Sequence, residues 1–305
     1  MRILVFGRDG QLGKAFAKQF NKCPEVFFIG RSDCNLSFVS QIQQCLKFYQ
    51  PQLLINASAY TNVDGAESDH ELAYAINEFA VEVMARYCKS NMTQFVHFST
   101  DYVFDGDKND SYIETDICRP LNVYGKSKLN GELAIQKILD TPTFTTKSQF
   151  LIIRTSWMYG DGENFIRNII HLSRNNTELK VISDQFGVPT NSDWLANITK
   201  QLINKQLVPS GIYHAVPSGR TTWYEIALHV VACAEKSGLI LRLATKNILP
   251  ILSREYHLSA RRPLNSCLAT AKIQSMLVTP NVFFDMGWKD QVEIYIKELV
   301  CQNLL

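Results

Sequence analysis

The feature that most constrains the fold is a glycine-rich turn near the start of the chain. The run RILVFGRDGQLGKAF places Gly7, Gly10 and Gly13 directly after a short apolar stretch and before an amphipathic one. Glycines let the chain turn tightly and let a pyrophosphate approach, while the N-terminus of the next helix offers N–H groups and a favourable dipole. The strand before it and the helix after it predict a dinucleotide-binding turn; the alternative is a tight turn without a ligand.

The first half of the chain alternates short apolar runs with stretches of helical periodicity. The predicted strands are RILVFG, EVFFIG, QLLINAS, QFVHFST and QFLIIRTS. Nearly continuous apolar strands separated by helices are typical of a parallel sheet that is covered on both faces. The predicted fold class is therefore α/β, with a doubly wound parallel-sheet Rossmann domain.

This alternation loosens after about Thr155. Helical patterns then occur at NFIRNIIHLSRN, DWLANITKQLINK and TTWYEIALHVVACAEKSG, with polar and proline-containing loops between them. We therefore expect an NAD(P)-binding Rossmann domain over residues 1–155 and a smaller α/β substrate-binding lobe over residues 156–305. Some segments of the second lobe are expected to cross back to the first domain.

Composition argues against several classes of protein. A formal net charge of +2 over 305 residues gives no reason to expect a nucleic-acid partner or a polybasic membrane contact. No apolar run approaches the ~20 residues that span a bilayer, and the start of the chain does not resemble a signal peptide. The eight cysteines form no C-x-x-C pair, which favours reduced thiols over disulfides or zinc. We expect a cytoplasmic protein.

The end of the second predicted strand bears on the choice of cofactor. NAD enzymes of this architecture usually place an acidic residue there, next to the ribose 2′-hydroxyl. The sequence FFIGRSDCNLS instead places Arg31 and Ser32 in that region, with Asp33 close by. Because a guanidinium suits a 2′-phosphate, NADPH is the predicted cofactor, with NADH possible; Arg31 as a solvated loop charge is the alternative.

Two further stretches carry candidate chemistry. The fourth strand ends in HFSTDYVFDG, so Ser99, Thr100 and Asp101 are expected at the edge of the sheet where ligands bind. A helix that should begin near Pro120 carries Tyr124 and Lys128 one turn apart on the same face. His97 lies inside the strand and is expected to be a core or wall residue.

The pair on the helix suggests a carbonyl reductase. A free tyrosine has a pKa of about 10, and a nearby lysine ammonium would lower it. Hydride addition to a ketone leaves an alkoxide that needs a proton. Tyr124 can donate that proton, Lys128 can tune the phenol and hold the ribose hydroxyls, and Thr100 can hydrogen-bond to the carbonyl oxygen. The alternative is a coincidental pair on a surface helix.

Six motifs together resemble one known family. They are GRDGQLG, NASAYTNVDGAE, STDYVFDG, RPLNVYGKSKLNGE, RTSWMYGDGENF and SDQFGVPT. They look like the successive motifs of the dTDP-4-dehydrorhamnose reductases, an extended branch of the short-chain dehydrogenase/reductases, from residue 1 to about residue 268. The resemblance implies NAD(P)H-dependent reduction of the C4 ketone of dTDP-4-dehydro-L-rhamnose to dTDP-L-rhamnose, a polysaccharide precursor. A dTDP-sugar would be the substrate, bound by the second lobe.

The resemblance also implies roles for individual residues. The catalytic set would be Thr100, Tyr124 and Lys128. The other cofactor contacts would be Gln11 and Leu12 at the pyrophosphate, Asn35 and Leu36 near the adenine, Ala57, Ser58, Ala59 and Tyr60 at the nicotinamide half, and Ser99. The substrate contacts would be Val63, Asp101, Tyr102 and Trp157 at the sugar, and Asn164 and Arg262 at the nucleotide end. Core packing of Trp157 and a solvated Arg262 are the alternatives.

The chain departs from the family pattern in two places. Some members bridge a dimer with Mg²⁺ through glutamates, one of them in the helix after the glycine turn. That helix here reads GKAFAKQF and offers no carboxylate, although Asp193 and Asp290 are expected near the other two positions. We therefore expect no metal, and a monomer or homodimer. The usual Asp-Leu after the second strand is Asn35-Leu36 here, which would weaken a ribose or adenine contact.

Two other functions remain open. One is a related dTDP-4-keto-deoxysugar reductase, such as a dihydrostreptose-type enzyme, which would share the same catalytic residues. The other is a non-catalytic NADP-binding regulatory subunit of the methionine adenosyltransferase type, which is similar to this family. The presence of Thr100, Tyr124 and Lys128 favours catalysis. The absence of a G-x-S-x-G motif argues against a hydrolase.

Overall fold

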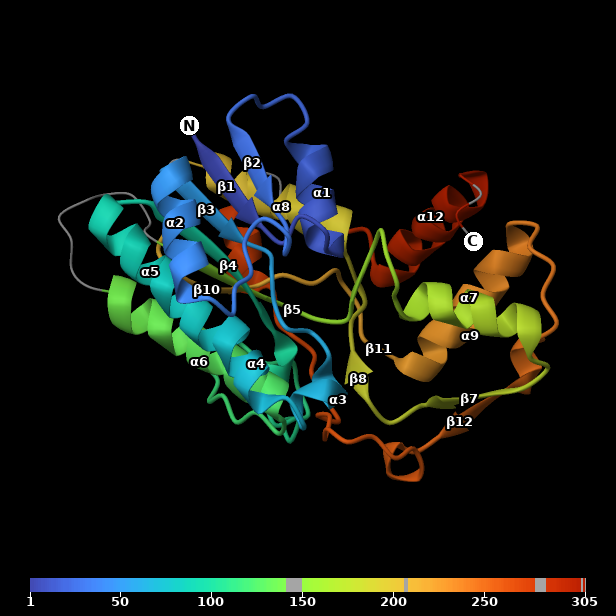
Figure 1. Ribbon diagram of the computed structural model, residues 1–305. Coiled ribbons are helices and arrows are strands. Elements are labelled where there is room, and N and C mark those ends of the chain that lie inside the picture. Colours follow the sequence, from blue (N-terminus) through green and yellow to red (C-terminus); the bar gives the residue numbers. More distant parts are fainter. Residues whose placement is uncertain (141–149, 206–207, 278–283, 303, 305) are drawn as a thin grey trace.

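The fold is built on one six-stranded sheet (Figure 1). The computed structural model describes residues 1–140, 150–205, 208–277, 284–302 and 304. In spatial order the strands are β2 (Val26–Ile29), β1 (Ile3–Phe6), β3 (Leu53–Asn56), β4 (Gln94–Thr100), β5 (Phe150–Thr155) and β10 (Gly211–His214), all paired in parallel. The predicted α/β class with a doubly wound parallel sheet is confirmed. The strand order reverses between β1 and β3, where ligands bind in open sheets.

Helices cover both faces of this sheet, which explains the continuous apolar strands. Every residue of β1 and β3 is buried, as expected for strands packed on two sides. One face is covered by α2 (Val39–Tyr49), α5 (Ala80–Asn91) and α6 (Val123–Leu139), and the other by α1 (Gln11–Gln19), α8 (Ser192–Asn204) and α10 (Ala271–Met276) (Figure 1). Polar residues such as Asn56 and Thr100 lie at the carboxyl ends of β3 and β4, and they too are buried.

One stretch of helical periodicity in the first half does not form a regular α-helix throughout. The stretch SDHELAYAINEFAVEVMARYCKSN forms α4 (His70–Tyr74), a π-helical turn η1 (Ala75–Phe79) and then α5, following the short α3 (Val63–Ala66). A π-helical turn inserts an extra residue into the spiral and is frequent at functional sites. Here the buried side chain of Asn77 lies in that turn.

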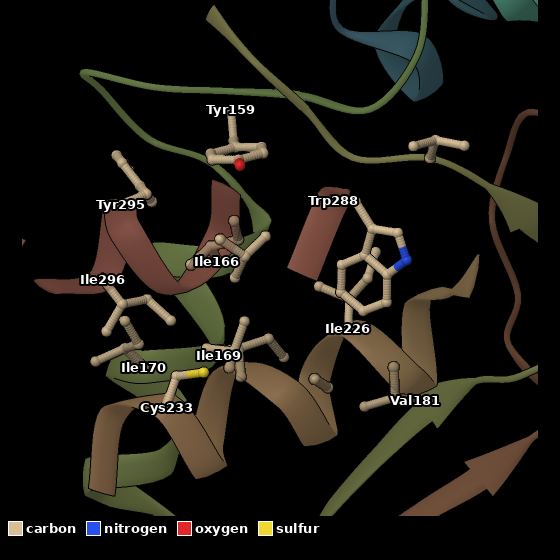
Figure 2. Close-up of a cluster of buried hydrophobic side chains, with 14 of the residues drawn as sticks. Tyr159, Ile166, Ile169, Ile170, Val181, Ile226, Cys233, Trp288, Tyr295 and Ile296 are labelled. Carbon is tan, nitrogen blue, oxygen red and sulfur yellow. The ribbon is translucent and has the colours of Figure 1, made fainter. Parts of the chain in front are cut away.

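A second lobe has its own apolar core (Figure 2). It is made of α7 (Phe165–Asn175), α9 (Trp223–Lys236) and α12 (Trp288–Cys301), beside the parallel pair β7 (Leu179–Ile182) and β12 (Ile248–Ile251). Ile166, Ile169 and Ile170 of α7 share one face of the helix at a spacing of three and four residues and point into this core. Ile226 of α9 and Trp288 of α12 meet them there.

Several late segments lie on the first-half sheet. Helix α8 packs against α1, β10 pairs with β5, and α10 packs on β10. Shorter pairs are β6 (Met158–Tyr159) with β9 (Thr190–Asn191) and β8 (Phe186–Gly187) with β11 (Thr221–Thr222). Short 3-10 turns occur at η2 (Asp101–Val103), η3 (Thr245–Asn247) and η4 (Ser253–Glu255). Where a domain boundary falls stays a prediction.

The cysteines and helices bear on two expectations from composition. All eight cysteines are free thiols; Cys34, Cys88, Cys233 and Cys267 are buried, whereas Cys23 and Cys301 are exposed. Within the described ranges, no helix combines the length and the apolar character that a membrane span requires. The location of the protein in the cell stays a prediction.

Candidate active site

A cavity of about 570 Å³ opens at the carboxyl ends of β1, β2 and β3. It collects most of the residues predicted to bind the cofactor. Those that line it are Gly7, Gly10, Gln11, Leu12, Arg31, Asn35, Leu36, Ala57, Ser58 and Ala59. The loops after three neighbouring strands thus form one elongated site at the switch point of the sheet.

The glycine turn leaves room where side chains would collide. Gly7 has a φ of +97°, and a Cβ added there would lie 2.7 Å from the carbonyl carbon of Ala57. A Cβ on Gly13 would lie 1.9 Å from the carbonyl oxygen of Gly7. Helix α1 begins after Gly10 with no side-chain cap and no acidic residue in its first turn. Its first N–H groups and its dipole therefore suit an anion such as a pyrophosphate.

Two arginines lie near the cavity, Arg31 in the loop after β2 and Arg8 in the glycine turn after β1. Arg31 is exposed and lines the cavity. Arg8, which the sequence reasoning missed, pairs with Asp33 at 2.7 Å and reaches the hydroxyl of Ser32 at 3.4 Å. The carboxylate of Asp33 also accepts the backbone N–H of Gly30 at 2.8 Å. The position of Arg8 within the glycine turn GRDGQLG could have indicated a second arginine near the cofactor site.

Asn35 and Leu36 follow in the same loop. The Oδ1 atom of Asn35 accepts hydrogen bonds from the backbone N–H and the hydroxyl of Ser37, at 3.1 and 2.9 Å. Its side chain is thus used to close the loop. Leu36 is buried and lines the cavity. Both residues lie where an adenine contact is expected, and their roles stay predictions.

Helix α6 begins three residues later than expected. The sequence predicted a start near Pro120, but Asn122 caps the helix, accepting the backbone N–H of Gly125 at 2.7 Å. The other end of the Asn122 amide donates to the carbonyl oxygen of Arg261 at 2.7 Å. A Cβ on Gly125 would lie 2.2 Å from the carbonyl oxygen of Tyr102. Because Gly125 has no side chain, α6 can pack closely against the residues that follow β4.

Tyr124, Thr100 and Asp101 come together at this contact. Thr100 donates to Oδ1 of Asp101 at 3.0 Å and accepts the backbone N–H of Tyr102 at 3.1 Å. The rings of Tyr102 and Tyr124 meet edge to face, 6.2 Å apart. Burial raises the pKa of Tyr124 to about 12, and a hydrogen bond with Thr100 opposes this rise. Within the chain alone, then, the phenol is a weaker acid than expected; its tuning by Lys128 stays a prediction.

Lys128 is almost completely buried, with 2% of its surface exposed. Its ammonium nitrogen donates to the carbonyl oxygen of Phe98 at 2.6 Å and lies 3.4 Å from Nε2 of His97. Burial lowers the pKa of Lys128 to about 8, and Glu132 opposes that shift. Glu132 itself pairs with the buried Arg154 at 2.6 Å. Lys128 is thus held at a fixed place with an unusually acidic ammonium group.

Buried polar atoms at the end of β4 are left without partners. Within the described chain, neither Oδ2 of Asp101 nor Oγ of Ser99 has a hydrogen-bond partner. Burial raises the pKa of Asp101 to about 7. Such atoms are costly unless something satisfies them. They are therefore available to a bound ligand.

A second cavity, of about 360 Å³, lies on the side of the second lobe. Its lining includes Tyr102 and Arg262 together with Phe165 and Trp223. Arg262 forms an ion pair with Asp64, with Nη1 and Oδ1 2.8 Å apart. The cavity thus combines aromatic faces with a positioned guanidinium, which suits a nucleotide.

Trp157 stands beside this cavity in a strained conformation. Its φ is +42°, rare for a residue with a bulky side chain. Its indole stacks on Trp223 with ring centres 3.9 Å apart. Its Nε1 is buried and has no acceptor in the part of the chain that the structure describes. A strained backbone and an unused donor are both typical of a ligand site.

Ten predicted site residues lie outside the two cavity linings: Gly13, Ser99, Thr100, Asp101, Tyr124, Lys128 and Trp157, whose surroundings are given above, and Asn164, Val63 and Tyr60. Asn164 caps α7 and donates to Gly160, Gly162 and the hydroxyl of Tyr295. Val63 begins α3, and Tyr60 is held through its backbone. The binding roles of Asn164, Val63 and Tyr60 stay predictions.

Asn77 is a further polar residue that the sequence reasoning missed. Its Oδ1 accepts the backbone N–H of Tyr60 at 2.9 Å, and its Nδ2 donates to the carbonyl oxygen of Tyr60 at 3.1 Å and to the hydroxyl of Ser127 at 3.0 Å. It therefore ties the loop after β3 to α6. A single asparagine inside the otherwise mostly apolar run AYAINEFAVEV could have indicated a buried polar residue with a specific role.

The acidic residues considered for a metal lie apart from any ligand cluster. Asp193 pairs with Lys18 of α1 at 3.0 Å, and Asp290 lies in the first turn of α12. The described residues contain no group of three histidine, cysteine or acidic side chains placed to hold a metal ion.

Comparison with known proteins finds one consistent family. The RmlD substrate binding domain family matches residues 1–301. The dTDP-4-dehydrorhamnose reductase of Escherichia coli strain K12 is 39% identical over 312 residues, which covers 98% of this chain and 98% of the relative. A similar protein of the same description from Burkholderia thailandensis is 34% identical over 99% of this chain and 100% of its own.

Solved structures agree with the sequence relatives. A dTDP-4-dehydrorhamnose reductase from Clostridium acetobutylicum superimposes with a TM-score of 0.87 at 30% identity, covering 98% of this chain and 99% of the other. A dTDP-4-dehydrorhamnose reductase from Bacillus anthracis, solved in complex with NADP, gives a TM-score of 0.85 at 29% identity, with 97% and 99% covered.

Proposed function

This chain belongs to the dTDP-4-dehydrorhamnose reductase family, and on that basis we propose that it uses NADPH to reduce the C4 ketone of dTDP-4-dehydro-L-rhamnose to dTDP-L-rhamnose. The single observation that carries the proposal is the meeting of Thr100, Asp101 and Tyr124 where β4 ends against α6. This meeting point is close to buried, unpartnered oxygens that a ligand would satisfy.

The larger cavity suits NADPH on several grounds. The space that a Cβ at Gly7 or Gly13 would fill, and the uncapped start of α1, suit the pyrophosphate. Arg31, with Arg8 nearby, suits a 2′-phosphate. Ser58 and Ala59 line the same cavity after β3, where we expect the nicotinamide. NADH would leave Arg31 without its anionic partner.

Residues at the end of β4 and on α6 would complete the reduction. When bound, NADPH supplies the hydride that adds to the ketone carbon. Tyr124 donates a proton to the ketone oxygen, so that the product is an alcohol. Thr100, already bonded to Asp101, positions that oxygen through its hydroxyl. Lys128 holds the ribose hydroxyls from its buried site.

The smaller cavity would bind the dTDP portion. Aromatic side chains such as Trp223 and Phe165 offer faces to the thymine and the sugar. Arg262, fixed by Asp64, offers its guanidinium to the diphosphate. The unused Nε1–H of Trp157 offers a donor to the substrate. Whether the protein acts as a monomer or a homodimer stays a prediction.

The direct test is an NADPH-oxidation assay with dTDP-4-dehydro-L-rhamnose. We expect turnover with this substrate and a product whose C4 configuration is that of L-rhamnose. Turnover with another dTDP-4-keto-deoxysugar but not with this one would instead show a related reductase. No turnover with any keto-sugar nucleotide, in protein that binds NADPH, would contradict the proposal.

A further inference from the structure

The imidazole ring of His97 lies between Asn56, at the end of β3, and Lys128, on α6. Its ring is fully buried within β4. Its Nε2 is 3.4 Å from the side-chain nitrogen of Lys128, and its Nδ1 is 3.2 Å from Nδ2 of Asn56 at the end of β3. The ring therefore bridges α6 and a neighbouring strand, which goes beyond the plain core role predicted for it.

The surroundings of Asn56 fix which nitrogen of His97 carries the proton. The Oδ1 atom of Asn56 accepts the backbone N–H of Ser58 at 3.2 Å and the Ser58 hydroxyl at 2.5 Å. A backbone N–H can only donate, so the amide oxygen must face Ser58 and the NH₂ group must face His97. Nδ1 of His97 then accepts, and the ring proton is placed on Nε2.

This tautomer presents an N–H group to Lys128. A charged ammonium has no lone pair to accept it, whereas an uncharged amine has one. Both forms can still donate to the carbonyl oxygen of Phe98 at 2.6 Å. We propose that His97 is a positioning residue that holds Lys128 in place and favours the uncharged form of its amine, through a ring tautomer fixed by Asn56.

The other groups near Lys128 do not favour its uncharged form as His97 does. Among the described residues, His97 on β4 contacts Lys128, and Glu132 on α6 acts on its charge. Arg154 on β5 pairs with Glu132, the neutral amide of Asn56 on β3 contacts His97, and that of Asn77 on η1 contacts Ser127, next to Lys128. Tyr124 precedes Lys128 by one turn of α6, and Asp101 on η2 follows β4 directly. Glu132 favours the charged lysine but is committed to Arg154. Burial lowers the pKa of Lys128 to about 8, and the His97 N–H acts in the same direction.

The consequence rests on the proposed reductase function. In that function Lys128 holds the ribose hydroxyls of NADPH, and a charged ammonium is the stronger hydrogen-bond donor to them. His97 would thus help to set the pH at which Lys128 loses its charge, and with it the upper pH limit of tight NADPH binding.

The tautomer itself can be measured on the wild-type protein. ¹⁵N-labelled histidine and two-bond ¹⁵N–¹H correlation spectra distinguish the two neutral tautomers from the imidazolium. We expect His97, assigned by its missing signal in His97→Gln, to be neutral with its proton on Nε2 from pH 6 to 9. A proton on Nδ1, or a charged ring, overturns the proposal whether or not the protein reduces a sugar.

A substitution at Asn56 tests the effect on Lys128. In Asn56→Asp the carboxylate accepts from Nδ1–H, so Nε2 becomes an acceptor for the ammonium. NADPH binding, followed by its fluorescence, should weaken above pH 8 in the wild type as Lys128 loses its charge. In Asn56→Asp this midpoint should rise by about one pH unit or more.

The double variant separates the ring from the added charge. With His97→Phe in the background, Asn56→Asp should no longer move the midpoint, because the ring that transmits the change is gone. An equal shift in the presence and absence of the ring would show a simple charge effect and overturn the proposal. If either variant fails to fold, the tautomer measurement on the wild type still decides.

Discussion

The sheet half and the second lobe of this protein bury different kinds of side chain. Beneath the sheet edge lie charged and hydrogen-bonded groups such as Lys128, His97 and the Arg154–Glu132 pair. The core of the second lobe is formed by isoleucines, valines and Trp288 (Figure 2). An ion pair of that lobe, Lys297–Glu293, is partly exposed on α12. The sheet half thus buries charged and hydrogen-bonded groups below the strand ends, whereas the core of the second lobe is apolar.

This difference follows from how each half is held together. A parallel sheet fixes the ends of its strands to a regular spacing, so residues after β1, β2 and β3 converge on one cavity. The second lobe places Trp223 and Phe165 at the other cavity through packing of α7 against α9. Substitutions in the sheet half should therefore change chemistry and cofactor binding, and those in the second lobe should change substrate binding.

The largest expected effect is on turnover in Tyr124→Phe. Because only the proton donor is lost, kcat should fall by roughly 1000-fold while NADPH affinity changes little. Tyr213→Phe is the matched control: it removes another buried tyrosine hydroxyl of the sheet half, bonded to Pro209 at 2.7 Å, and should leave kcat unchanged. Near-normal turnover of Tyr124→Phe would show that this phenol is not the acid.

The next effect contrasts buried and exposed charge. Glu132→Gln removes one partner of the buried Arg154 pair, so the free energy of unfolding should fall by about 3 kcal/mol. Glu293→Gln on α12 breaks exposed pairs and should cost under about 0.5 kcal/mol. Urea unfolding of both variants measures the contrast. Equal losses would mean that the two halves do not differ as described.

Two glycine substitutions separate the cofactor site from the substrate site. A Cβ at Gly13 meets the oxygen of Gly7 at 1.9 Å, so Gly13→Ala must distort the turn and should lower NADPH affinity roughly 100-fold. A Cβ at Gly187 meets the indole of Trp157 at 2.5 Å. Gly187→Ala should raise KM for the sugar nucleotide by roughly tenfold and leave NADPH affinity intact. Fluorescence titration and steady-state kinetics read the two effects.

The two glycine variants also test directly whether the sheet half binds the cofactor and the second lobe binds the substrate. If Gly187→Ala weakened NADPH binding as strongly as Gly13→Ala does, the second lobe would share the cofactor site. The comparison between the halves would then fail.

The smallest expected effect concerns the choice between NADPH and NADH. Arg31→Ala removes a guanidinium from the cofactor cavity, so the NADPH/NADH ratio of kcat/KM should fall by about tenfold. Arg119→Ala serves as the control, because Arg119 is exposed and 4.0 Å from its partner Asp105. An unchanged ratio in Arg31→Ala would leave Arg8 as the candidate for recognising the 2′-phosphate.

Much of the sheet half could be predicted from the sequence because its signals are local. The glycine turn, the apolar strands and the S-T-D strand end each occupy a few consecutive residues, and sheet geometry brings them together. The fold class is confirmed on these grounds. Predictions near helix starts were less accurate, because Asn122, and not Pro120, supplies the cap of α6.

The features of the site that the sequence did not predict depend on contacts between residues far apart in the chain. The link from Asn77 to Tyr60 and Ser127 arises from a π-helical turn that apolar periodicity does not reveal. The side chain of Asn164 caps α7, which the motif around it does not reveal, and its contact with the nucleotide stays a prediction. The environment of Lys128 required the register of β3 beside β4, which aligns Asn56 with His97. Tertiary placement of polar side chains is what sequence patterns leave open.

The central claim is that side chains at the end of β4 and on α6 position a sugar ketone, so that its carbon receives the hydride of NADPH and its oxygen receives the proton of Tyr124. It is tested most directly with NADPH carrying deuterium at the reactive C4 position of the nicotinamide, incubated with dTDP-4-dehydro-L-rhamnose. We predict deuterium at C4 of the rhamnosyl product from the wild type, and none from Tyr124→Phe within the same time. Oxidation of the labelled cofactor without deuterium at the sugar C4, or no oxidation at all, would contradict the account.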